Sequence, residues 1–248
     1  MSKVPEVTLL FWVIKIAATT LGETGGDAVS MSMGLGYLLG TMIFAVIFLV
    51  AVVVQVRATR FHPVLYWTTI VATTTVGTTL ADFADRSLGI GYAGGSALLL
   101  ALLLMSLAIW YRTLGTVAVD SVSSAKAESF YWVTIMFSQT LGTALGDWTA
   151  DSAGLGYTGA ALIFGGLLTL VAGAYLLTAV SRTALFWAAF ILTLTLGAVV
   201  GDFLDKPLAD GGLALSRYSA SAALIVFIVA CIWMFPQRAA VAKTTLDA

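Results

Sequence analysis

The chain alternates between long apolar stretches and short polar or glycine-rich segments, and eight such stretches occur in all. Each has about the 20 residues that an α-helix needs to cross the ~30 Å hydrocarbon core of a membrane. The pattern predicts an all-α, polytopic membrane protein in which residues 1–248 form a single membrane domain. The predicted transmembrane helices lie at residues 7–28, 37–56, 64–84, 92–111, 129–149, 157–180, 184–204 and 217–235.

One polar pattern occurs four times in these stretches, so the eight helices group into four tandem two-helix repeats. A tryptophan opens each copy, and a threonine, a glycine and an aspartate follow it at constant spacing; in three copies a tyrosine follows as well. The fourth copy inserts residues 206–212 and delays its tyrosine to Tyr218. The repeats span residues 7–56, 64–111, 129–180 and 184–235, followed by a cytoplasmic tail at 236–248. The tryptophans are Trp12, Trp67, Trp132 and Trp187; the glycines are Gly22, Gly77, Gly142 and Gly197.

The two helices of a repeat differ in polarity, which predicts which of them lies inside. The second helix is nearly pure hydrocarbon, as at residues 98–104, whereas the first carries many hydroxyl groups, as at residues 73–75. A polar stripe needs protein or water beside it, so the first helices should form an inner ring and the second helices an outer one. Because each repeat crosses the membrane twice, we expect the copies to be related by a pseudo-rotation axis along the membrane normal. Small residues four apart, such as Gly22 and Gly26, favour close packing of the inner helices.

Composition narrows the class of protein further. Hydrophobic residues make up 60% of the chain and charged residues only 10%, whereas a soluble domain has about 25% charged residues. A net charge of -1 offers no basic surface for nucleic acid. A single cysteine, Cys231, and a single histidine, His62, exclude a disulfide framework and a Cys/His metal cluster. The sequence shows no nucleophile–base pair and no cofactor fingerprint, so we expect neither an enzyme nor a bound cofactor.

The distribution of Lys and Arg predicts the orientation. Eight of these residues lie on the side that holds the termini and the connections between repeats, and three lie in the turns within repeats. Positive residues favour the cytoplasmic side of a membrane. Both termini should therefore be cytoplasmic, in a bacterial inner membrane, and the tryptophans and tyrosines of the repeats should anchor the helices at the interfaces.

The inner helices carry acidic residues at depths where a charge is costly. Counted from the tryptophan at 1.5 Å per residue, the repeated aspartate lies about 22 Å deep, and Glu23, present in the first repeat only, lies near the midplane. Thr20, Glu23 and Asp27 share one helix face because they are three and four residues apart. Oxygen atoms converging from four helices suit a hard cation such as Mg²⁺, Ca²⁺, Mn²⁺, Na⁺ or H⁺. The predicted cation- or proton-binding residues are Glu23, Asp27, Asp82, Asp147, Asp202, Thr20, Thr75, Thr140 and Thr195, with Glu23 and Asp27 as metal ligands and Asp85, Asp151 and Asp205 as an outer vestibule.

Structural roles are open for the same residues. The repeated aspartates could cap helix ends or pair with Arg86, Lys206 or Arg217, because the residues that follow them have the composition of a turn. The threonines could donate to carbonyls of their own helices, and the second acids could lie at the surface. Lys15 could extend to the interface or neutralise Glu23 through a neighbouring helix.

The four units that begin at Trp12, Trp67, Trp132 and Trp187 resemble a family of bacterial integral membrane proteins built from four tandem two-helix repeats, whose function is not settled. That resemblance covers nearly the whole chain and implies fold and location. Residues 23–27, Glu-Thr-Gly-Gly-Asp, are similar to the Glu-x-Gly-Asp signature of cation/proton exchangers that act on calcium and manganese. They contain an extra glycine and lack the basic-hydroxyl pair that follows the signature. The second similarity implies an ion-binding role for Glu23 and Asp27 alone.

These features favour a secondary transporter that exchanges a hard cation for protons through buried carboxylates. A pseudo-four-fold cation channel is the first alternative, although the turns are too short to hold a pore helix and a filter. A membrane sensor or assembly module without transport activity is the second. The expected partners are the lipid bilayer and a small inorganic cation or proton, with no nucleic acid; homo-oligomer formation is left open.

Overall fold

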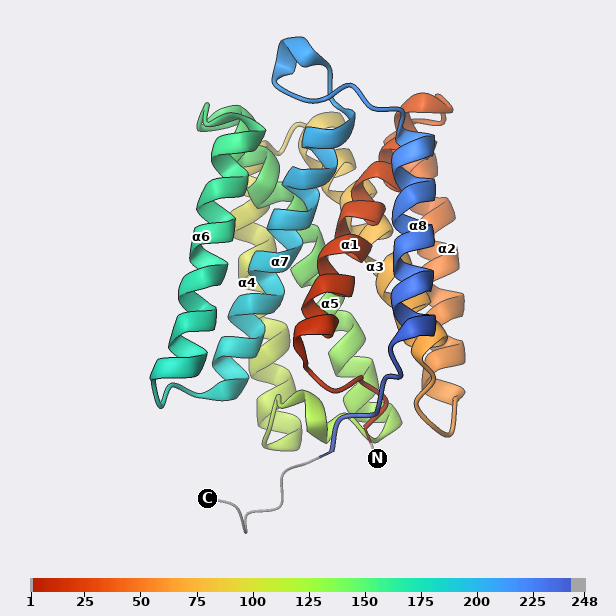
Figure 1. The fold of residues 1–248 in the computed structure, drawn as a ribbon, viewed down its shortest axis with the longest axis vertical. Helices are drawn as coiled ribbons and strands as arrows, with labels where there is room; N and C mark the ends of the chain where they lie inside the picture. Colours follow the sequence, from red (N-terminus) through yellow and green to blue (C-terminus); the bar gives the residue numbers. More distant parts are fainter. Residues whose placement is uncertain (1, 242–248) are drawn as a thin grey trace.

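The computed structural model describes residues 2–241, and these fold into eight long α-helices (Figure 1). The helices are α1 (Leu9–Asp27), α2 (Gly36–Arg57), α3 (Pro63–Asp82), α4 (Tyr92–Leu114), α5 (Ala125–Asp147), α6 (Gly156–Leu177), α7 (Arg182–Asp205) and α8 (Arg217–Met234). Each coincides with a predicted apolar stretch to within a few residues, which confirms the all-α prediction for this part of the chain. Of the predicted tail at 236–248, residues 242–248 lie outside the described residues.

The inner helices begin at residues suited to a helix N-terminus. The side chains of Thr8, Ser124 and Ser181 accept hydrogen bonds from backbone N–H groups in the first turns of α1, α5 and α7, at 3.3, 3.2 and 3.4 Å. Such caps satisfy amides that the helix itself leaves free. Pro63 opens α3, where its missing N–H costs nothing.

The odd-numbered helices form a closed inner ring. Helices α1, α3, α5 and α7 pack side by side in that order, and α7 packs against α1. The even-numbered helices lie outside this ring, as predicted from their composition. Only 11% of the most apolar 18-residue stretch of α6 is buried inside the protein, whereas 67% of the corresponding stretch of α7 is buried. Within residues 2–241, five helices (α2, α4, α6, α7 and α8) are long and apolar enough to cross a membrane.

Each even helix packs against the inner helix of the next repeat rather than that of its own. Thus α2 packs on α3, α4 on α5 and α6 on α7, and α8 closes the circle by packing on α1. The segments that flank α1 and α8 meet at one end of the bundle (Figure 1). There the Ala240 N–H donates to the Val4 carbonyl at 2.8 Å, and Pro5 and Ala239 form an isolated β-bridge. The two ends of the described chain therefore hold the ring closed.

Glycines at the repeated position let neighbouring inner helices approach closely. A Cβ on Gly77 would lie 3.0 Å from the backbone nitrogen of Thr140, and one on Gly142 would lie 3.1 Å from that of Thr195. Gly22 faces the Thr74 side chain, and Gly197 faces the Thr19 side chain and the Thr20 backbone nitrogen. Each repeated glycine thus packs on the next helix around the ring. Close backbone approach of this kind supports helix association in lipid, where no hydrophobic force draws helices together.

An aromatic belt fills the end of the ring that carries the tryptophans. The residue before each tryptophan contacts the tryptophan of the next inner helix, with ring centroids inside the range of about 4.5–7 Å that is usual for aromatic pairs. The pairs are Phe11–Trp67 at 5.4 Å, Tyr66–Trp132 at 5.8 Å, Tyr131–Trp187 at 6.4 Å and Phe186–Trp12 at 5.7 Å. The hydroxyls of Tyr66 and Tyr131 lie 2.6 Å apart.

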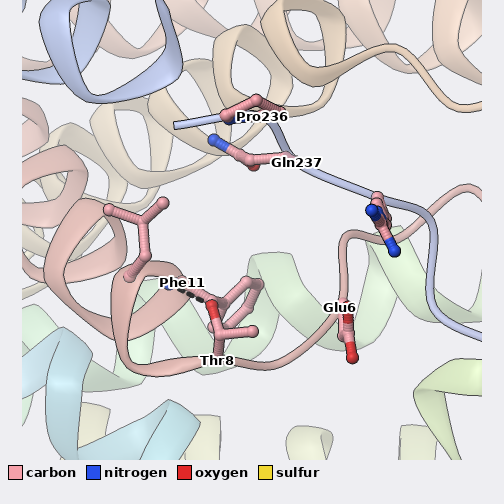
Figure 2. A pocket seen from close by; sticks show the side chains of 7 residues that line it. Glu6, Thr8, Phe11, Pro236 and Gln237 are labelled. Atoms are coloured by element: carbon pink, nitrogen blue, oxygen red, sulfur yellow. Dashed lines mark hydrogen bonds between the residues drawn. The ribbon is translucent and has the colours of Figure 1, made fainter. Parts of the chain in front are cut away.

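The prediction that the tryptophans are interface anchors is wrong for three of them. Trp67, Trp132 and Trp187 are only 1–5% exposed. The aromatic residue at the preceding position supplies a packing partner on the adjacent helix, so these rings are buried in the belt. A pocket of about 390 Å³ lies at this end, between residues 6–11 and residues 236–238 (Figure 2). The pocket is remote from Asp27. Sixteen residues of α1 separate its lining residue Phe11 from Asp27, which is about 24 Å at 1.5 Å per residue.

We predict that Gly197→Ala destabilises the ring by about 1–3 kcal/mol, the usual cost of overpacking a well-packed core. The added Cβ would collide with the Thr19 side chain and press on the α1 backbone, which cannot move aside without opening the α7–α1 contact. The matched control is Gly173→Ala in α6, where nothing lies within 4 Å of the added carbon. Unfolding titrations of both variants in detergent measure the difference. Equal stability of the two variants would contradict the glycine contact.

Candidate functional site

The repeated aspartates lie at the opposite end of the inner ring from the aromatic belt. Asp27, Asp82 and Asp147 each end an α-helix and are followed at once by a π-helical turn: η1 (Ala28–Ser32), η2 (Phe83–Ser87) and η4 (Trp148–Ser152). The prediction of a turn directly after these aspartates is therefore wrong, because the helix widens and continues before the chain reverses. The reversal comes at Gly-x-Gly, where both glycines have positive φ, for example 69° at Gly34 and 75° at Gly36.

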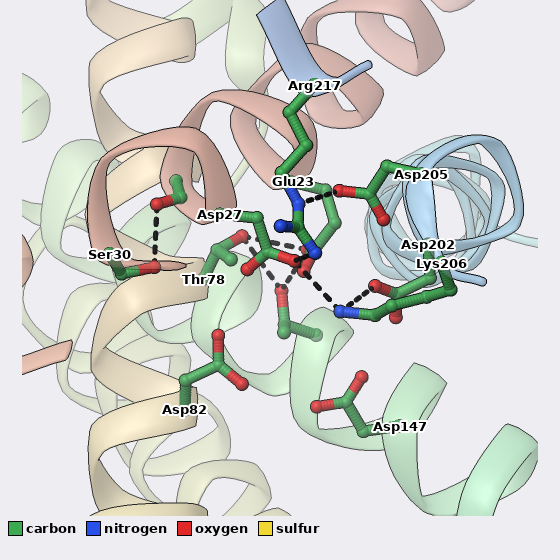
Figure 3. Close-up of polar contacts among 12 residues, drawn as sticks. Glu23, Asp27, Ser30, Thr78, Asp82, Asp147, Asp202, Asp205, Lys206 and Arg217 are labelled. Carbon is green, nitrogen blue, oxygen red and sulfur yellow. Dashed lines mark hydrogen bonds and ion pairs between the residues drawn. The ribbon is translucent and has the colours of Figure 1, made fainter. Parts of the chain in front are cut away.

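All four repeated aspartates are buried and form ion pairs. Arg86 lies between Asp82 and Asp147: its Nε is 2.7 Å from Asp82 Oδ1 and its Nη2 is 3.2 Å from Asp147 Oδ2. Lys206 lies between Asp27 and Asp202, with its Nζ 2.8 Å from Asp27 Oδ2 and 2.9 Å from Asp202 Oδ1 (Figure 3). Each of these two cations is thus shared by carboxylates on neighbouring inner helices.

A third cation, Arg217 at the start of α8, joins the same cluster. Its Nε is 2.6 Å from Asp205 Oδ2, and its Nη2 is 3.6 Å from Asp27 Oδ2. The alternative that the repeated aspartates cap helix ends is not what the structure shows, since the side chains of Asp27, Asp82 and Asp147 make no capping hydrogen bond. The alternative of pairing with basic residues is the one observed.

The paired cations stay charged. Burial is the largest single effect on Lys206 and would lower its pKa, but the nearby carboxylates of Asp202 and Asp27 together raise it more, so the pKa lies above its usual range. The same balance holds for Arg86, where Asp82 and Asp147 outweigh burial and raise the pKa. Both side chains therefore remain cations at any physiological pH.

Glu23 lies one helical turn below the aspartates, toward the aromatic belt, and has no cationic partner within 4.0 Å among residues 2–241. Its Oε2 accepts hydrogen bonds from Thr78 at 3.0 Å and Thr143 at 3.3 Å, and these two hydroxyls are 3.2 Å apart. The residue is 3% exposed. Gly201 makes room for it, because a Cβ there would lie 2.6 Å from Glu23 Cβ.

Two sets of three carboxylates bring their oxygens together in the described part of the chain. The atoms of Glu23, Asp27 and Asp82 lie within 4.8 Å of one another, as do those of Asp27, Asp202 and Asp205. Asp27 belongs to both sets. All-carboxylate donors suit hard divalent cations such as Mg²⁺, Ca²⁺ and Mn²⁺.

The hydroxyls of the repeated threonines turn back to their own helices. Each donates to the carbonyl four residues earlier, so the backbone alternative is observed, and the role of their oxygens as ligands stays a prediction. The hydroxyl-to-carbonyl distances are 3.0 Å for Thr20, 2.8 Å for Thr75, 3.0 Å for Thr140 and 3.2 Å for Thr195. The hydroxyls at the site belong instead to Thr78 and Thr143. They could have been found from the sequence, since they occupy the position of Glu23 in their repeats.

The predicted outer residues and Lys15 have different surroundings. Asp205 belongs to the cluster, Asp85 is buried but lies outside both sets of carboxylates, and Asp151 is exposed. Lys15 is fully buried, with its Nζ 3.9 Å from the centroid of the Phe190 ring and 3.5 Å from Gln139 Oε1. It neither reaches an interface nor pairs with Glu23, so both roles considered for it are wrong.

We predict that Arg86→Met destabilises the protein by about 2–3 kcal/mol, somewhat less than the loss of a fully buried partner because this side chain is 30% exposed. The change leaves Asp82 and Asp147 buried without their shared cation. Arg112→Met is the control, since Arg112 is exposed and makes no ion pair within residues 2–241. Apparent unfolding free energies in detergent give the comparison. A loss no larger than that of the control would mean that the bridge does not hold α3 and α5 together.

Comparison with known proteins places the repeat in a family. The family described as Repeat of Unknown Function (DUF347) matches four times, at residues 10–61, 65–121, 130–181 and 185–239. No curated protein and no solved structure matches the chain. These comparisons give no support to the similarity of residues 23–27 to cation/proton exchangers. Each matched segment carries one repeated tryptophan, glycine and aspartate, the residues that build the ring. The chain belongs to the family of tandem Repeats of Unknown Function (DUF347).

Proposed function

We propose that this protein is a secondary membrane transporter that carries a small hard cation in exchange for protons, with Glu23 as the central binding group. The observation that carries the proposal is the state of Glu23: its carboxylate is buried in the ring, accepts hydrogen bonds from two hydroxyls and has no cation within 4.0 Å among residues 2–241. An isolated ionised carboxylate in such surroundings costs several kcal/mol or more. It must therefore hold a proton or a cation.

The contacts of Glu23 suit an exchange between these two occupants. Thr78 and Thr143 donate to one oxygen, Oε2. Those two hydrogen bonds can persist whether the carboxyl group carries a proton or binds a cation. The oxygens of Asp27 and Asp82 lie within 4.8 Å and can complete the coordination of the ion. One carboxylate that takes either a proton or a cation is the simplest device for coupled exchange.

The closed aromatic belt favours a carrier over the channel alternative. Buried rings fill the end of the inner ring between Glu23 and the chain termini, and the Tyr66–Tyr131 hydrogen bond crosses between α3 and α5 there. A channel needs a continuous conducting path, whereas a carrier keeps one side closed at a time. We place the open side at the aspartate end, where Arg86 and Arg217 are partly exposed.

We further propose that all eight helices cross a bacterial inner membrane, with both termini in the cytoplasm and the even helices in contact with lipid. The excess of Lys and Arg on the side of the termini supports this orientation. The exposed surfaces of α2, α4, α6 and α8 are rich in large apolar side chains. We expect no enzymatic activity, no cofactor and no nucleic-acid partner, and homo-oligomer formation is left open.

A membrane sensor or assembly module is the second candidate function. The observation that favours it is that Arg86 and Lys206 each join carboxylates on two helices, as a purely structural network would. Glu23 separates the two candidates, because its carboxylate adds nothing to that network of ion pairs.

We predict that Glu23→Gln lowers proton-coupled cation flux in proteoliposomes at least tenfold while the protein stays folded. The amide oxygen can still accept from Thr78 and Thr143, but the side chain can neither release a proton nor balance the charge of an ion. Flux of Mn²⁺, Mg²⁺, Ca²⁺ and Na⁺ is followed with a pH-sensitive dye. Glu6→Gln, at an exposed position near the chain terminus, is the control.

Three results would contradict the proposal. Unchanged flux in Glu23→Gln would remove Glu23 from the mechanism. Single-channel currents of many ions per opening would favour the channel. Failure of every cation in the panel to be transported by the unaltered protein would favour the sensor or assembly module.

A further inference from the structure

The connection between α7 and α8 is built to hold one lysine inside the cluster. Helix α7 ends at Asp205, and the chain folds back along its last turn: the Leu213 N–H donates to the Phe203 carbonyl at 2.8 Å, and the Ala214 N–H donates to the Lys206 carbonyl at 2.9 Å. These bonds fix the Lys206 backbone on the rim of the ring. Its side chain, 10% exposed, points inward to Asp27 and Asp202 (Figure 3).

We propose that Asp27, Asp202 and Asp205 form a divalent-cation site and that Lys206 is a tethered competitor for it, its ammonium group occupying the place of the ion. The inference rests on the proposed function, which requires a cation to enter the ring from the aspartate end. It names the class of the ion and the residue that regulates its binding.

The donor geometry supports a site rather than a closed network. One oxygen from each of the three carboxylates lies within 4.8 Å of the others. Arg217 holds Asp205 through Oδ2. The second oxygen, Oδ1, has no hydrogen-bond partner in the described part of the chain, and the side chain is only 1% exposed. Figure 3 shows this free oxygen pointing toward Asp202. A buried carboxylate oxygen with no donor is left unsatisfied by the protein's own groups.

The two shared cations differ in their capacity to leave. Arg86 has a planar guanidinium that contacts Asp82 and Asp147 through two different nitrogens, which fixes its orientation. Lys206 carries a compact charge on a flexible four-carbon stem and can swing away from its two carboxylates. One half of the aspartate ring therefore keeps its cation in a fixed orientation, and the other half can exchange its counter-ion.

The local charge selects a divalent ion. Once Lys206 withdraws, Arg217 is the one cation within 4.0 Å of the three carboxylates among the described residues. The site then carries an excess of negative charge that one divalent cation balances. Oxygen donors alone exclude a preference for soft metals and suit Mn²⁺, Mg²⁺ or Ca²⁺.

The test is Mn²⁺ binding to the purified full-length protein, measured by calorimetry and by the Mn²⁺-induced rise in melting temperature. Lys206→Met should lower the half-saturating Mn²⁺ concentration at least tenfold and should melt at a lower temperature than the unaltered protein when Mn²⁺ is absent. Lys206→Arg keeps the charge and should show no gain. Lys126→Met removes an exposed lysine elsewhere and controls for the change in net charge.

Asp205→Asn keeps the proposal testable if Lys206→Met does not fold. As a single substitution it should raise the half-saturating Mn²⁺ concentration several-fold. Combined with Lys206→Met, where that variant is stable, it should cancel the tighter Mn²⁺ binding. Equal Mn²⁺ binding by Lys206→Met and the unaltered protein, or an equal gain in Lys206→Arg, would overturn the proposal. An unchanged Mn²⁺ response in Asp205→Asn would do the same.

The result can be separated from a failure of the transport proposal. Glu23 is not one of the three ligands, so Glu23→Gln should keep the Mn²⁺ response of this site while losing flux. Mn²⁺ binding that responds to Lys206 but comes without flux in any variant would support the site and contradict transport. Flux that depends on Glu23 while Mn²⁺ binding ignores Lys206 would contradict the site alone.

Discussion

The structure depends on balancing buried negative charge across the contacts between inner helices. A buried aspartate without a partner costs several kcal/mol, and this ring contains four at equivalent positions. The chain supplies one cation for each two aspartates and places it between neighbouring helices, so Arg86 joins α3 to α5 and Lys206 joins α7 to α1. The same contacts therefore offset part of the buried negative charge and close the ring.

The other two contacts around the ring have no such bridge among the described residues, and this difference gives the site its location. Between α1 and α3, the carboxylates of Asp27, Asp82 and Glu23 approach one another without a shared cation. A proton or an external ion can supply the positive charge there, as Arg86 does between α3 and α5 and Lys206 does between α7 and α1. The same gap separates α5 from α7, but no glutamate lies below it, since Thr143 and Ala198 occupy the position of Glu23.

Features that recur in every repeat could be predicted from the sequence. Features that depend on which helix lies alongside could not. Apolar length located the helices, and the glycine spacing indicated the close contacts around the ring. The packing of α2 on α3 rather than on α1 could not be derived, because a short turn permits either neighbour. The hydrogen bond from Thr20 to the Ile16 carbonyl could not be derived, because the spacing from Glu23 shows a shared face but not where the hydroxyl proton points. The burial of Trp67 could not be predicted, because its packing partner, Phe11, lies on a neighbouring helix.

Lys15 raises the question of whether a distant cation could serve Glu23 instead. Both residues lie on α1, eight residues apart, which is about 12 Å at 1.5 Å per residue. Two unit charges at that distance attract by about 1.4 kcal/mol at an effective dielectric constant of ~20. That is less than the cost of burying either charge, and Lys15 is already in contact with the Phe190 ring and Gln139. Glu23 therefore cannot depend on Lys15 as its counter-ion, and its charge must be balanced by something that enters the ring.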